Sequence, residues 1–227
     1  WIYAALGFTL MFPVLWLVIL RVVGNPQYVD YFVTGTVVNT SFVVPFLATS
    51  QDIANFRRAT TVYSLLYSNG ANHWDIALGY MAQLMIYIVP SIVALLLFSM
   101  LIMGVSYGAV QFMAAVVVAV LISLSSALLG YAMAMGIRNY RVVNQVSQVI
   151  PWPLLLLAPV YYPIAILPTA LRYVSLALPT TYMALAVNGA LYLRPHELLI
   201  GLLGLLIYSL ASILIARHAI ARSEVNG

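Results

Sequence analysis

The chain has 227 residues, of which 64% are hydrophobic and only 6% are charged. Soluble domains carry about 25% charged residues, so this composition cannot cover a water-facing surface and predicts an integral membrane protein. The nine basic residues are all Arg, and the chain has no Cys. Without Lys or Cys there is neither a phosphate-binding P-loop nor a metal site built on thiolates. The net charge of +4 is too thinly spread to indicate nucleic-acid binding.

Six apolar segments are candidates for membrane spans, since a spanning helix needs about 20 apolar residues. Within a single transmembrane domain over residues 1–227, the predicted spans are 1–23, 31–49, 76–103, 110–135, 142–158 and 198–216. The fifth is shorter and contains Pro151 and Pro153. The first begins at Trp1 without a preceding Met, so we expect further residues upstream.

The link between the second and third spans is long enough for a helix of its own. Apolar and polar residues alternate there between two faces, at spacings of three and four residues. The polar face contains Arg57, Arg58, Thr61 and Ser64. This pattern predicts an amphipathic helix over 52–68 at the cytoplasmic membrane surface.

A different pattern precedes the last span, where prolines occur at positions 159, 163, 168 and 179. Each Pro removes a backbone donor and crowds the preceding turn, so a continuous spanning helix is disfavoured. We predict instead a re-entrant pair of short helices over about 164–190 that enters the outer leaflet and turns back. The expected fold is therefore all-α, with six spans, one amphipathic helix and one re-entrant hairpin.

The distribution of Arg predicts the orientation of the spans. With both chain ends in the cytoplasm, six Arg lie inside and three outside, in agreement with the positive-inside rule. A seventh span at 173–193 would reduce this difference to five against four, and inverting the chain would reverse it. We therefore expect both ends to be cytoplasmic.

Catalysis or proton coupling within a membrane requires ionisable groups at depth. Here the acidic residues and His fall in predicted loops, near span ends or at the terminus, so we expect no catalytic residues and no metal site. The polar residues within the spans are neutral. One group lies in the second span and another at the start of the fifth, and they either bond neighbouring helices or line a pathway.

The proline-spaced segment carries a family resemblance. It reads Pro159-Val160-Tyr161-Tyr162-Pro163, then Leu167-Pro168, then Leu178-Pro179-Thr180-Thr181-Tyr182. With the six spans and the amphipathic helix, this run resembles the permease subunits of type-2 ABC exporters. One departure is that Arg57-Arg58-Ala59-Thr60-Thr61 lacks the Gly that the family often has in its interfacial helix.

The resemblance implies a half-transporter in the plasma membrane of a prokaryote, surrounded by lipids. Two permease chains, identical or homologous, would enclose a pathway, while separate ATPase subunits bind ATP and Mg and this chain binds no cofactor. Helix 52–68 would be the coupling element. The implied ATPase-coupling residues are Arg57, Arg58, Thr61, Ser64, Arg138 and Arg141. The implied pathway residues are Thr36, Asn39, Thr40, Val43, Gln145, Gln148 and Trp152, and the implied outer gate is Pro159, Tyr161, Tyr162 and Pro163.

Two other classes of protein have the same expected topology. A non-transporting scaffold or assembly factor would not support ATP hydrolysis by a bound partner, and a passive channel would need a selectivity filter such as a ring of charge. For the Arg residues, the alternative to ATPase contact is a topology signal alone. For a transporter, the neutral lining suits amphiphilic drugs, lipids or lipid-linked glycans better than small ions.

Overall fold

The computed structural model describes residues 29–58 and 61–225, together with positions 7, 10, 11, 13–15, 17–19 and 21. Every regular element in these residues is helical, which confirms the predicted all-α class. The predicted span 1–23 lies largely outside the described residues.

Four helices have the length and composition of membrane spans. They are α2 (Val29–Arg58), α4 (His73–Met103), α5 (Ala109–Gly136) and α10 (Pro195–Val225). At 1.5 Å per residue a helix of 28 residues is about 42 Å long, more than the ~30 Å hydrocarbon core of a bilayer. The described residues therefore contain four candidate spans, or five if the bent pair α8 and α9 counts as one.

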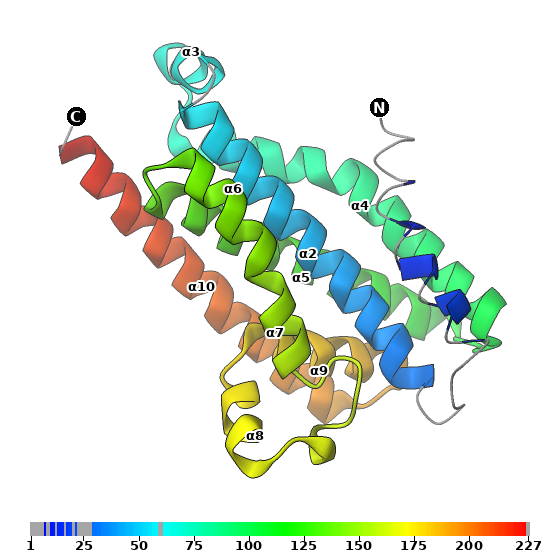
Figure 1. The fold of residues 1–227 in the computed structure, drawn as a ribbon. Helices are drawn as coiled ribbons and strands as arrows, with labels where there is room; N and C mark the ends of the chain where they lie inside the picture. Colours follow the sequence, from blue (N-terminus) through cyan, green and yellow to red (C-terminus); the bar gives the residue numbers. More distant parts are fainter. Residues whose placement is uncertain are drawn as a thin grey trace.

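Helix α2 is the centre of the bundle, with α4, α5, α6 and α9 packed around it (Figure 1). In the most apolar stretch of α2, 72% of the residues are buried, whereas in that of α10 only 22% are buried. Helices α2 and α5 cross closely at Gly130, where an added Cβ would lie 2.5 Å from the carbonyl oxygen of Phe46. The absence of a side chain at Gly130 therefore permits the two backbones to approach.

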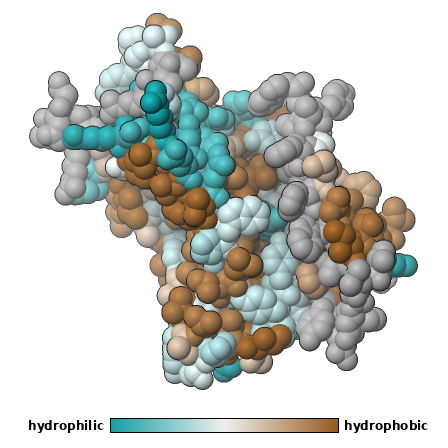
Figure 2. Space-filling model, viewed as in Figure 1, coloured by the Kyte–Doolittle hydropathy of each residue, from teal (hydrophilic) through white to brown (hydrophobic). Residues whose placement is uncertain are grey.

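Large apolar side chains remain exposed along the sides of α4, α5 and α10. Leu101 is 78% exposed, Val110 74% and Leu214 64%. Figure 2 shows brown, hydrophobic side chains over much of the visible face and teal, hydrophilic ones gathered around the start of α6. Continuous exposed apolar surface of this kind fits a bundle whose solvent is lipid.

The predicted amphipathic helix over 52–68 is wrong in its bounds. Helix α2 continues to Arg58, and a separate short helix, α3, covers only Val62–Ser68. Hydropathy falls after residue 49, but the helix continues because Ile53 and Ala54 are buried in the bundle core. Packing thus extends the helix beyond the point where its apolar composition ends.

The predicted span 142–158 is also divided. Helix α6 covers Tyr140–Val149 and α7 covers Pro151–Leu157, with Pro151 at the first position of α7. Pro has no N–H to continue the hydrogen bonding of the preceding helix, but it is well tolerated in a first turn. Neither piece is long enough to be a candidate span by itself.

Short helices occupy the proline-spaced segment, as predicted. A 3₁₀ turn, η2 (Ile164–Ile166), precedes α8 (Thr169–Leu176) and α9 (Pro179–Leu191), and α8 and α9 are bent by 81° relative to each other. Helix α9 packs along α10 and also contacts α2 and α5. In Figure 1 the α8 end of the bundle lies opposite the α3 end, where the chain also finishes.

Candidate functional site

The four implied pathway residues on α2, here called the α2 stripe, lie in two environments: they are Thr36, Asn39, Thr40 and Val43. Thr36 and Thr40 are buried in the bundle, and the Thr36 hydroxyl donates to the carbonyl oxygen of Val33 at 2.9 Å. Asn39 and Val43 are only partly buried. Thr36 and Thr40 therefore contribute to packing around α2, whereas Asn39 and Val43 reach a surface.

The predicted residues of α6 and α7 lie on one exposed face. Gln145 and Gln148 are exposed and Trp152 is 50% exposed, whereas Val143 and Ser147 on the opposite side are buried. Because α6 packs on α2, the exposed face points away from that contact. If these side chains line a pathway, a second molecule must provide its other wall.

Side-chain amides join α2 to α6 on their buried sides. Gln51 donates from Nε2 to the Ser147 hydroxyl at 3.0 Å, and Asn144 donates from Nδ2 to Oδ1 of Asn55 at 3.1 Å. Asn144 and Ser147 belong to the polar group at the start of the fifth predicted span, whereas Gln51 and Asn55 were not among the predicted residues. Their four-residue spacing, which places two amides on one helix face, is the signal that could have found them.

The predicted coupling residues separate into a buried group and an exposed group. Arg57 is partly buried, and its guanidinium donates to the carbonyl oxygen of Ala134 at 2.9 Å, in the last turn of α5. Thr61, Ser64, Arg138 and Arg141 are exposed. The side chain of Arg58 lies outside the described residues.

Arg138 and Arg141 flank the start of α6, where hydrophilic side chains gather (Figure 2). The Arg141 side chain donates from Nε to the hydroxyl of Tyr140 at 3.3 Å. This hydrogen bond raises the pKa of the Arg141 guanidinium, which is exposed at the surface.

Helix α3 has no buried side of its own within the described residues. Val62, Leu65, Leu66 and Tyr67 are 44–57% exposed, although all four are apolar or aromatic. Figure 1 shows α3 projecting beyond the ends of α2 and α4. An exposed short helix with apolar side chains is a surface that a partner can bury.

A capped turn joins α3 to the start of α4. The side chain of Asn72 accepts hydrogen bonds from the backbone N–H groups of Trp74 at 2.8 Å and Asp75 at 3.0 Å, and Asp75 accepts from the Asn72 N–H at 3.0 Å. The rings of Tyr67 and His73 lie 5.1 Å apart. This reciprocal capping box fixes the direction in which α4 leaves α3.

Asp52 provides a further contact between α2 and α4. This carboxylate was predicted to begin a separate amphipathic helix at the membrane surface, but it lies within α2, partly buried, and accepts a hydrogen bond from the Tyr80 hydroxyl. The ring of Phe56 also meets that of Tyr80 at 6.1 Å. Movement of α4 would therefore act directly on α2.

At the α8 end, the predicted gate residues Pro159, Tyr161, Tyr162 and Pro163 are all partly buried. The Tyr161 ring lies 5.8 Å from that of Phe32 on α2. The Tyr162 hydroxyl donates to the carbonyl oxygen of Leu156. The structure therefore brings Tyr161 against α2 and joins Tyr162 to the end of α7.

These arrangements place an exposed helix at one end of a membrane-type bundle and, at the other, a segment whose Tyr161 ring packs against α2. A family model for ABC-2 type transporters matches residues 3–192. The chain is a member of the ABC-2 type transporter family. A search of curated proteins finds no match.

Membership confirms the predicted family and makes the chain the transmembrane component of an ABC transporter. The ABC-2 match extends from the first predicted span to the end of α9, so it includes the α2 stripe, α3, α6–α7 and the proline-spaced segment. ABC-2 membrane components carry no ATPase site and associate with ABC ATPase subunits. A membrane component of this family therefore depends on its contacts with an ATPase subunit for the energy of transport.

Proposed function

We propose that the chain is one half of an ATP-driven exporter, with both of its ends in the cytoplasm of a prokaryotic cell. Two copies pair, and each contributes the α2 stripe and the exposed face of α6–α7 to a shared pathway. Separate ATPase subunits, which hold ATP and Mg, dock at the α3 end. The α8–α9 pair is re-entrant in the outer leaflet and closes the outer end.

The exposed apolar surface of helix α3 is the main support for this proposal. Its apolar side chains are exposed, while its capped link to α4 and the Asp52–Tyr80 contact connect it to the bundle. An ATPase that closes on ATP and presses on α3 would therefore displace α4 and, through Tyr80, α2. Thr61, Ser64, Arg138 and Arg141 are exposed at the same end and complete the docking surface.

The nature of the substrate follows from the side chains at the proposed lining. Asn39 and Val43 on α2 and Gln145, Gln148 and Trp152 on α6–α7 offer amide, apolar and aromatic groups without charge. An amphiphilic molecule can bury its apolar part against Val43 and Trp152 and bond its polar part to the amides. We therefore propose a drug, a lipid or a lipid-linked glycan as the class of cargo.

The decisive experiment uses the absence of Cys from the chain. Ser64→Cys on exposed α3 would be treated with a thiol-to-amine cross-linker in native membranes. We expect an ABC ATPase to be captured and its yield to change with ATP and vanadate. Ser106→Cys, exposed in the loop between α4 and α5, is the matched control and should capture no ATPase.

The control also separates the proposal from its main alternative. If Ser64→Cys reacts from the cytoplasm but captures no ATPase, the coupling role of α3 is wrong. The chain would then be better explained as a scaffold within its family.

A further inference from the structure

Gly35 occupies an unusual place in α2. It is buried, and an added Cβ would overlap Cδ1 and Cε1 of the Tyr161 ring. Gly within a helix costs about 1 kcal/mol relative to Ala. Here the missing side chain leaves a notch in the surface of α2, and the ring of Tyr161 fills it.

The segment that carries Tyr161 is itself fastened to the bundle. Val160 is fully buried in the hydrophobic core, and its N–H donates within the segment, to the carbonyl oxygen of Ala158 at 2.8 Å. On the other side, the Tyr162 hydroxyl donates to the end of α7. The ring of Tyr161 is therefore held toward α2, where it contacts both Gly35 and the ring of Phe32.

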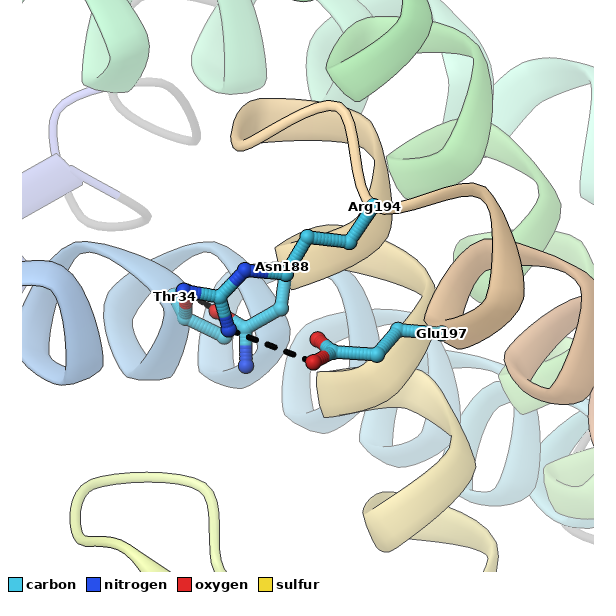
Figure 3. Close-up of polar contacts among 4 residues, drawn as sticks. All are labelled: Thr34, Asn188, Arg194 and Glu197. Atoms are coloured by element: carbon cyan, nitrogen blue, oxygen red, sulfur yellow. Dashed lines mark hydrogen bonds and ion pairs between the residues drawn. The ribbon is translucent and has the colours of Figure 1, made fainter.

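The neighbouring residue of α2 is held by a different helix. The Thr34 hydroxyl donates to Oδ1 of Asn188 on α9 at 2.6 Å (Figure 3). Figure 3 also shows the ion pair between Arg194 and Glu197, at 3.2 Å. Two consecutive residues of α2 thus join it to segment 158–163 and to α9.

We propose that the packing of the Tyr161 ring against Gly35 holds the outer end of the pathway closed. The inference rests on the proposed transport function and adds the α2 side of the gate. Asn39, one turn further along α2, lies about 6 Å beyond Gly35. When Tyr161 leaves the notch, segment 158–163 separates from α2 and exposes the pathway at Asn39.

The contact is tested by thiol accessibility in the complex with its ATPase. Asn39→Cys in the otherwise Cys-free chain reports access by a membrane-impermeant maleimide added from outside. Adding Gly35→Ala should displace the ring and raise the labelling rate about tenfold, the change produced when a closed state loses about 1.4 kcal/mol relative to an open one. Gly79→Ala on α4 is the matched control, since a Cβ there meets nothing within 4 Å.

Variants of Tyr161 provide the second half of the test. Tyr161→Ala removes the ring and should raise labelling as Gly35→Ala does, whereas Tyr161→Phe keeps the ring and should leave labelling unchanged. If both substitutions act on the same contact, the double variant Gly35→Ala/Tyr161→Ala should label no faster than the faster single variant. Independent effects would multiply the two rates instead.

The ATPase bound to each variant and its hydrolysis rate are measured in the same samples. If the ATPase binds but Gly35→Ala and Tyr161→Ala leave labelling unchanged, the inference about the gate is wrong and the proposed function stands. If the two rates multiply in the double variant, Gly35 and Tyr161 do not act as one contact. If the parent chain binds no ATPase, the proposed function fails instead.

Discussion

At the scale of single residues, Arg57 shows how a charge can serve the fold. The last carbonyl groups of a helix have no partner within the helix and carry partial negative charge. Arg57 on α2 donates to one of them, the carbonyl oxygen of Ala134 near the end of α5. It therefore joins two helices at the α3 end.

We expect Arg57→Gln to lower the free energy of unfolding by about 1–2 kcal/mol, because a hydrogen bond from a charged group is lost near a helix C-terminus. Arg141→Gln, which alters an exposed Arg on α6, should change it by less than about 0.5 kcal/mol. Thermal unfolding of the purified chain in detergent, followed by circular dichroism, measures both. Equal stability of the two variants would mean that Arg57 does not act as a link between helices.

At the scale of elements, the fold depends on how closely α2 and α5 approach. The site of Gly130 has backbone atoms of Phe46 and Ser50 as its neighbours, at 2.5 and 3.1 Å from the position of an added Cβ. Backbone atoms cannot rotate away as the end of a flexible side chain can. A larger residue must therefore move one helix relative to the other.

Gly130→Ala should destabilise the chain by about 1–3 kcal/mol, the usual cost of overpacking a well-filled core. The same substitution at Gly136, the last residue of α5, should be neutral or slightly stabilising, since a Cβ there meets nothing within 4 Å. Unfolding temperatures of the two variants in the same detergent provide the comparison. A lower stability for Gly136→Ala than for Gly130→Ala would contradict the close crossing.

At the scale of the whole molecule, the described chain leaves polar side chains exposed on α6–α7. Gln145 and Gln148 face away from the contact between α6 and α2, whereas the exposed faces of α4, α5 and α10 are dominated by apolar residues. An uncharged polar face beside apolar faces is poorly suited to lipid. A second copy facing it would provide a polar surface and the other wall of the proposed pathway.

Gln148→Cys should therefore link two copies when a bifunctional maleimide is added to membranes containing the otherwise Cys-free chain. Leu206→Cys, 56% exposed on α10, should remain monomeric because that face is expected to meet lipid. Denaturing gel electrophoresis distinguishes the two species. Linked dimers from Leu206→Cys but not from Gln148→Cys would place the interface on α10 instead.

Composition and periodicity were sufficient to predict the class of fold and most of its long helices. Only 6% of the residues are charged, and several apolar runs exceed 20 residues. Such runs are long enough to span a bilayer as helices, which satisfy their own backbone hydrogen bonds in lipid. The prolines at 163, 168 and 179 likewise predicted short helices, because Pro restricts the backbone locally whatever surrounds it. The exposed position of Ser64 also followed from helix periodicity.

Tertiary contacts decided what local pattern could not. Helix α2 continues past its apolar segment because Ile53 is buried among other helices. Asp52 therefore lies within α2 rather than at the start of a separate helix, and Tyr80 donates to it. The notch at Gly35 exists only because Tyr161 returns to it from a distant part of the chain. Such pairings depend on which residues meet across the bundle, and spacing along one helix carries no information about a partner more than 100 residues away.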